Sequence, residues 1–385
     1  MRVPESPAVD TGFELCHRER ADDWFPHYAL GNLWYDKGVW FKAIKCWKDA
    51  LEVSPQNSAV MRNLAIATYN KLGDRDEALR LMERAALYAP DDARLYYELD
   101  ILRRLMNYPV KKRLKDMADK IELVESRDDL FTEYITLLNS EKYYEFALRA
   151  INRHSFHPWD GGSGRIIKQY SSAHTGIARE LISDGDYEGA IAELDSALSY
   201  PENLGEGRPD WCRMGEVYYT LGYAFENVDK IEALKYYQKV IEETNELGGY
   251  PSESAITQFF FRTLAFGRLG KTKEEQGGYN RLIDYSEQHM DDEVELDYFS
   301  VLNSDFVVFD GDVKQINYVN CCYMSALGYY GKGMKEKSDE FIEKGLAVDA
   351  AHPGLLFIKH IDERAPKMKE DDPTLLRPAN WNTTK

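Results

Sequence analysis

One stretch near the N-terminus, residues 26–55, constrains the fold most because its apolar residues recur at helical spacing in two matched halves. In the first half Leu30 and Trp34 lie one helical turn apart, with the small residue Gly31 beside them. The second half carries a small–large–small face and then a proline: Ala43, Trp47, Ala50 and Pro55. The pattern predicts two helices joined by a turn at Gly38, with Gly31 allowing a neighbouring helix to approach closely.

The same pattern returns in the next segment of the chain. Leu64-Ala65 follow Leu30-Gly31 by 34 residues, whereas the later matches follow by 35 residues. Those later matches are Gly73, Ala78, Met82, Ala85 and Pro90. The change of offset predicts one extra residue near Lys71-Leu72. Because one hairpin cannot bury its own apolar face, we expect a stack of such units.

These spacings resemble the tetratricopeptide repeat (TPR), a helical hairpin of about 34 residues. The match is most specific at 24–92, 170–201 and 213–247. The resemblance implies an all-α fold, a right-handed α-solenoid (superhelix) of TPR-like helical hairpins. A competing architecture is a closed (α/α) toroid, which in some sugar hydrolases carries carboxylates in a central cavity. The regular spacing favours the open superhelix.

The chain divides into five expected parts. They are an N-terminal extension (1–23), TPR-like units ending in a Gly-rich loop (24–165), central TPR-like units (166–290), an atypical segment with the last hairpin and a capping helix (291–364), and a C-terminal tail (365–385). Within the atypical segment, β-branched and aromatic residues precede Asp310-Gly311. That stretch fits either a short strand or a helix followed by a turn.

Composition excludes several functional classes. The 385 residues include 48 basic and 66 acidic side chains, a net charge of −18, which argues against nucleic acid or an anionic membrane as partner. No apolar run is long enough for a membrane helix or a secretory signal. The five cysteines show no CxxC pairing, so we expect no metal, no cofactor and a reducing cytoplasm. No HExxH or GxSxG motif is present, and no catalytic residue is predicted.

Two Gly-rich breaks supply the first candidate binding residues. In the break at 154–165, Trp159 could stack on a sugar or a partner side chain, with His157 and Asp160 as hydrogen-bonding groups. The alternative is a structural crossover in which Trp159 plugs between units. The second break, 201–211, also follows a second helix, so both should emerge on one edge. The predicted joint site consists of Trp159, Asp160, Glu206, Arg208 and Trp211, and the two loops add His157 and Asn203 as further candidate binding residues.

The groove lined by the first helix of each unit supplies the second set. Its polar and aromatic candidates are Asn32, Tyr35, Asn63, Tyr69 and Asn70. An Asn side chain both donates and accepts hydrogen bonds, which suits clamping the backbone of an extended peptide. The alternative is an ordinary solvated helix surface.

A narrower resemblance concerns His157-Pro-Trp-Asp-Gly-Gly-Ser-Gly164, Pro201-Glu-Asn-Leu-Gly-Glu-Gly207 and the run from Leu282 to Phe299. These segments resemble the C-terminal repeat region of large bacterial proteins that carry an N-terminal β-sandwich domain suspected of handling carbohydrate. That domain is not part of this sequence, so no catalytic residue carries over.

We therefore predict a non-catalytic scaffold, cytoplasmic and bacterial in style, that binds a peptide or partner domain through the groove and the edge loops. The alternative is an accessory region of a carbohydrate-active system, binding sugar or a glycosidase-like domain. An enzyme is the third interpretation. The first unit, 24–57, could also stack on a second copy of the chain.

Overall fold

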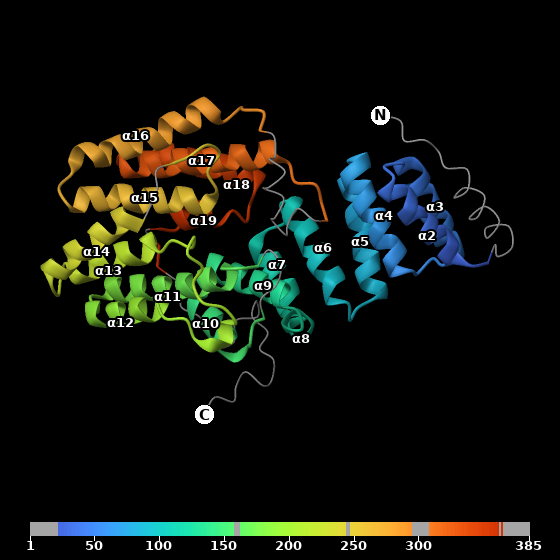
Figure 1. The fold of residues 1–385 in the computed structure, drawn as a ribbon, viewed down its shortest axis with the longest axis horizontal. Coiled ribbons are helices and arrows are strands. Elements are labelled where there is room, and N and C mark those ends of the chain that lie inside the picture. Colours follow the sequence, from blue (N-terminus) through green and yellow to red (C-terminus); the bar gives the residue numbers. More distant parts are fainter. Residues whose placement is uncertain (1–21, 158–161, 244–246, 295–307, 362, 365–385) are drawn as a thin grey trace. The chain divides into compact units, whose positions relative to one another are not determined.

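The computed structural model describes residues 22–157, 162–243, 247–294, 308–361, 363 and 364 (Figure 1). Every regular element in these ranges is helical, so the predicted all-α class is confirmed. The helices follow one another as pairs, as expected for a TPR-like solenoid. The Trp159–Asp160 pair and the stretch before Val308 lie outside the described residues.

The first pairs are α2 (Trp24–Asp36) with α3 (Trp40–Val53), α4 (Ser58–Ala67) with α5 (Arg75–Tyr88), α6 (Ala93–Leu105) with α7 (Val110–Ala118) and α8 (Ile121–Glu125), and α9 (Asp128–Ser140) with α10 (Tyr144–Arg153). The later pairs are α11 (Arg165–Asp184) with α12 (Tyr187–Ala197), α13 (Gly215–Phe225) with α14 (Lys230–Glu243), α15 (Glu253–Arg268) with α16 (Thr272–His289), and α17 (Val313–Gly331) with α18 (Lys335–Val348). The short helix α19 (Pro353–Lys359) follows them.

Close contact of a small residue with a large one holds the first pair together. Trp47 on α3 is only 2% exposed, and its indole ring lies where a Cβ atom on Gly31 of α2 would be. Gly38 ends the turn between the two helices with a φ of +73°, which L side chains rarely adopt. The roles predicted for these glycines are confirmed. Helices α13 and α14 repeat the contact, with Gly222 against the ring of Tyr237.

The extra residue predicted near Lys71-Leu72 is absorbed by a change of helix type. After Ala67 the chain continues as a π-helical turn, η1 (Thr68–Leu72), before Gly73 reverses it with a φ of +69°. A π turn holds more residues per turn than an α-helix, so it takes up an insertion without breaking the helix. The insertion thereby sets the direction in which Tyr69, Asn70 and Lys71 project.

The described chain forms two compact units. Unit 1 contains α2–α6 together with Val308–Asp310, and unit 2 contains α7–α19. The boundary falls after Met106, inside the range 24–165 that the sequence groups together. It coincides with the hairpin whose second helix lacks the repeat signature, and in the structure that helix is split into α7 and α8. The unit boundary thus coincides with the hairpin that lacks the small–large pattern.

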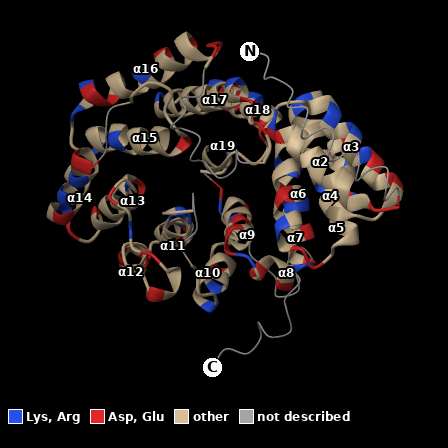
Figure 2. Ribbon diagram, turned by 45° about the vertical axis from the view of Figure 1, so that its right-hand side comes forward, with Lys and Arg blue, Asp and Glu red and all other residues tan. Residues whose placement is uncertain are grey.

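In unit 2 the last helix lies against the first helices of earlier pairs. Helix α19 contacts α17, α18 and α9 (Figure 2). Leu355 and Ile358 belong to the core between α15 and α18, and Phe357 packs on the core of α11–α15. Beyond α9, the Lys142 ammonium donates to the carbonyl oxygens of His360 and Glu363 at 2.8 and 2.6 Å. The capping helix expected from the sequence therefore also covers the inner face of unit 2.

Two neighbouring glycines of α16 should respond oppositely to substitution. A Cβ on Gly278 would overlap the buried side chain of Thr263, whereas a Cβ on Gly277 meets nothing within 4 Å. We expect Gly278→Ala to lower the free energy of unfolding by about 1–3 kcal/mol through overpacking. Gly277→Ala should raise it by about 0.5–1 kcal/mol through helix propensity. Urea denaturation of both variants measures this, and destabilisation by Gly277→Ala would contradict the packing described.

Candidate functional site

The two Gly-rich breaks lie together in unit 2, and Asn203 joins them. Its side-chain amide donates to the carbonyl oxygens of Ile151 and His154 at 2.8 and 3.0 Å. The backbone carbonyl oxygen of Asn203 accepts the N–H of Phe156 at 2.8 Å. Because both the side chain and the backbone of Asn203 are engaged, this residue fixes one loop against the other.

Glu206 makes the second connection between the loops. Its carboxylate accepts the backbone N–H of Gly164 at 2.7 Å and the hydroxyl of Ser163 at 3.1 Å. Gly164 precedes the first turn of α11, so the negative charge also complements the positive end of that helix dipole. Glu206 therefore has a structural role at the position predicted for ligand binding.

The remaining loop residues differ in how freely they meet solvent. Trp211 is 64% exposed, although its ring edge lies against the backbone at Gly164. Arg208 forms an ion pair with Glu243 at 3.6 Å, and His157 has an 83% exposed side chain. Of the predicted edge residues that the structure describes, Trp211 and His157 are the most exposed to a partner.

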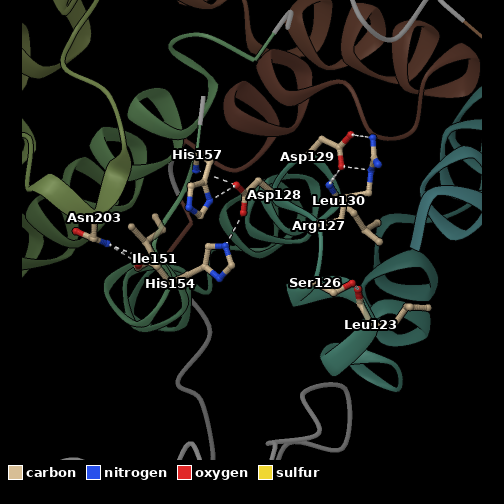
Figure 3. Close-up of polar contacts among 10 residues, drawn as sticks. All are labelled: Leu123, Ser126, Arg127, Asp128, Asp129, Leu130, Ile151, His154, His157 and Asn203. Atoms are coloured by element: carbon tan, nitrogen blue, oxygen red, sulfur yellow. Dashed lines mark hydrogen bonds and ion pairs between the residues drawn. The ribbon is translucent and has the colours of Figure 1, made fainter. Parts of the chain in front are cut away.

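Asp128 at the start of α9 anchors the loop that carries His157 (Figure 3). One carboxylate oxygen lies 2.6 Å from Nε2 of His154. The other accepts the backbone N–H of His157 at 2.8 Å and lies 3.2 Å from its Nδ1. Burial alone would raise the pKa of Asp128, but these hydrogen bonds hold it below its ordinary value. The sequence analysis did not single out Asp128, since its partners come from a separate loop.

In unit 1, the predicted groove residues fall into two groups. Asn32 accepts hydrogen bonds from the indole N–H of Trp47 at 3.1 Å and from the amide of Asn63 at 2.8 Å. Asn63 also accepts from Arg62 at 3.1 Å. The ring of Tyr35 packs edge-on to Trp40, with 4.9 Å between centroids. These three candidates are held by contacts within the repeats themselves.

Tyr69 and Asn70 instead hold another piece of chain. The Asn70 amide donates to the carbonyl oxygen of Val308 at 2.9 Å, and its oxygen accepts the N–H of Asp310 at 2.8 Å. Between them, Phe309 is fully buried, with its ring 5.2 Å from that of Tyr69. One amide therefore pairs with the backbone of Val308 and Asp310 at two points, the donor-and-acceptor chemistry expected of the groove asparagines.

Residues on both sides of this contact were missed by sequence reasoning. Lys71, next to Asn70, forms an ion pair with Asp310 at 3.0 Å. For the apolar stretch before Asp310-Gly311 the sequence predicts either a short strand or a helix followed by a turn. Nothing in its spacing relates it to η1, more than 230 residues earlier. Such a long-range pairing leaves no periodic signal in a single sequence.

A polar network across the first helices of unit 2 was also missed. Lys168 on α11 lies 2.7 Å from Glu253 on α15, and Arg179 lies 2.9 Å from Glu216 on α13. Burial would raise the pKa of Glu253, but the ammonium of Lys168 keeps it below its ordinary value. These carboxylates are engaged with cations, an arrangement that joins non-adjacent helices.

The described residues also bear on the predictions about metal-binding clusters, cysteines and membrane-spanning helices. Among them, no cluster of three or more His, Cys, Asp or Glu side chains is arranged to hold a metal ion. Cys321 and Cys322 are free thiols in the core, as expected for small buried residues. None of the helices within the described ranges is long and apolar enough to cross a membrane.

Comparison with known proteins supports the repeat class. No family model matches the sequence. A curated relative, a TPR repeat-containing protein of Methanocaldococcus jannaschii, is 24% identical over 375 residues, covering 84% of this chain and 56% of the relative. The chain thus spans about half the length of the curated relative it matches. The relative's name supports the TPR interpretation of the hairpins.

Several solved structures resemble the chain at low scores. The TPR domain of P58(IPK) is 13% identical, with 90% of this chain and 99% of that chain covered and a TM-score of 0.27. Naa15/Naa10 bound to HypK-THB is 13% identical, with 88% and 61% covered and a TM-score of 0.35. TM-scores this low carry no conclusion about function.

Removing the anchor of the first loop should destabilise unit 2 in a pH-dependent way. We expect Asp128→Asn to lower the free energy of unfolding by about 1–3 kcal/mol at pH 7, since charge-assisted hydrogen bonds to two histidines are lost. A carboxyl whose folded pKa is depressed contributes stability above its unfolded pKa of about 4. That contribution disappears as the pH falls through the folded pKa.

Urea denaturation between pH 3 and pH 7 tests this expectation. The difference between wild type and Asp128→Asn should narrow below about pH 4. The exposed pair of Lys115 and Asp119 provides the control, because Asp119→Asn should change the unfolding free energy by less than about 1 kcal/mol. A difference for Asp128→Asn that stays constant over the whole range would contradict the role of the charge.

Proposed function

We propose that the chain is a non-catalytic protein-interaction scaffold that binds extended peptide segments through the groove of unit 1. The carrying observation is the two-point hydrogen bonding of Asn70 to the backbone at Val308 and Asp310. Backbone groups are common to all peptides, so the Asn70 side chain can form the same hydrogen bonds with a partner peptide as with this segment. The TPR-named archaeal relative supports the same class of function.

The edge loops of unit 2 are the second proposed contact surface. Asn203 and Glu206 hold the loops in register, while Trp211 and His157 stay exposed. Trp is among the residue types that most often carry binding energy at protein interfaces, and a loop that is already ordered loses less entropy on binding. The inner face of unit 2 is covered by α19, so the proposal assigns the groove function to unit 1.

The predictions on carbohydrate binding, cellular location and self-association stay predictions. The carbohydrate-associated function depends chiefly on Trp159 and Asp160, which lie outside the described residues. A cytoplasmic location, a bacterial style of architecture and stacking of the first unit on a second copy rest on the sequence alone. The exclusion of nucleic acid rests on the net charge of −18.

Panning of a random peptide library displayed on phage tests the proposal. The full chain is immobilised as wild type, as Asn70→Asp and as Trp211→Ala. Asn70→Asp keeps the acceptor for a partner N–H but replaces the donor by a second acceptor, so groove ligands should bind at least about 10-fold more weakly. Peptides that depend on Trp211 would belong to the edge loops.

The two variants act as controls for each other, since one lies in unit 1 and the other in unit 2. Enrichment that is lost with either variant supports the scaffold and locates its surface. If every peptide enriched on wild type binds both variants equally, these surfaces do not carry the function.

A further inference from the structure

We infer that the groove of unit 1 selects partner segments in which a large aromatic residue is followed by an acidic residue, and that Val308–Asp310 is the chain's own competitor for that groove. The inference rests on the proposed function and gives it a ligand class. The chain's own segment displays the three features by which such a partner would be recognised: backbone, ring and charge.

The backbone contacts fix the spacing of the ligand. Asn70 donates to the carbonyl oxygen of the residue before the aromatic one and accepts from the N–H of the residue after it. The two bonded residues are therefore separated by one position, which the aromatic residue occupies. The residue after the aromatic one must carry an N–H, so proline is excluded there.

The aromatic position is selected by burial. Phe309 is completely buried, and its ring meets the ring of Tyr69 at 73°, an edge-to-face arrangement. Tyr69 is itself only 9% exposed. A ligand with a small side chain at this position would leave this site unfilled, so a ring is required for tight binding.

The acidic position is selected by charge. The ammonium of Lys71 lies 3.0 Å from the carboxylate of Asp310, whose side chain is 60% exposed. The same ammonium lies 5.1 Å from the centre of the Trp40 ring, and this cation–π contact restricts the positions of the Lys71 side chain. An exposed ion pair adds little affinity, but it discriminates against a basic residue at that position.

The internal segment competes because it is part of the same chain. A tethered ligand has a high effective concentration, so an external peptide binds only the fraction of molecules whose groove is empty. Weakening the internal segment should therefore strengthen external binding. Simple destabilisation of the fold would have the opposite effect.

The test uses a fluorescein-labelled synthetic peptide of residues 304–314 and the full chain, with fluorescence anisotropy as readout. We expect the peptide to bind Phe309→Ala at least about 10-fold more tightly than wild type, because the groove is vacated. Asp310→Pro is the second variant: it removes the N–H that Asn70 accepts and the exposed carboxylate that pairs with Lys71, and it replaces no buried side chain. It should also strengthen peptide binding, and circular dichroism checks that both variants stay folded.

Charge exchange provides the specific control. Lys71→Glu, combined with Phe309→Ala in the protein, should weaken binding of the natural peptide and favour a peptide carrying Asp310→Lys. Asn70→Asp in the same background should abolish binding of either peptide. A peptide with Phe309→Ala should bind none of the proteins measurably.

Several outcomes would overturn the inference. Equal binding of the peptide to wild type, Phe309→Ala and Asp310→Pro would show that the segment does not compete. A concentration-dependent dimer of wild type that is lost in Phe309→Ala, measured by light scattering, would show that a second copy supplies the segment. Library peptides that need Asn70 but lack the aromatic–acidic pattern would refute the ligand class while leaving the scaffold intact. If panning yields no peptide on wild type and none on Phe309→Ala, whose groove is vacated, both the scaffold and the ligand class fail.

Discussion

The contact of a small residue on one helix with a large ring on the next is the interaction on which the array depends. A helical hairpin has apolar residues on both sides, so its stability comes from the neighbours on which it stacks. Gly31 under Trp47 and Gly222 under Tyr237 bring paired helices close enough to bury these rings. Where the pattern is lost, in the hairpin that contains Met106, the second helix is split into α7 and α8, and the boundary between the two compact units falls there.

A single inserted residue links this architecture to function. The second repeat is one residue longer than the first, and the surplus is taken up by the π turn at Thr68–Leu72 rather than by a looser loop. The turn brings Asn70 and Lys71 onto the segment at Val308–Asp310, while Tyr69 packs on its aromatic ring. Turns of this kind are frequent at functional sites because an insertion can redirect side chains without disrupting the surrounding helix.

Sequence reasoning succeeded where the signal is local and periodic. The helical class, the closing roles of Gly31 and Gly38 and the surplus residue near Lys71 all follow from spacing. It could not foresee contacts between distant segments, such as those of Asp128 with His157 or Asn70 with Val308, because no period relates them. Sequence reasoning also could not predict the hydrogen bond between Asn32 and Asn63. The same asparagine pattern is expected whether the amide binds a ligand or a neighbouring helix.

In each unit a segment of the chain itself lies against repeat helices, but the two segments differ in how firmly they are held. Helix α19 contributes Leu355 and Ile358 to a core and adds Phe357 to another, so removing it would expose several apolar side chains. Val308–Asp310 is held by one buried ring, worth about 2–3 kcal/mol, and by a few polar contacts of which the ion pair is largely exposed. A segment that covers the helices permanently needs several apolar core contacts, as α19 has. A segment that a partner can displace needs few contacts, as Val308–Asp310 has, since a partner with one ring and one carboxylate can replace all of them.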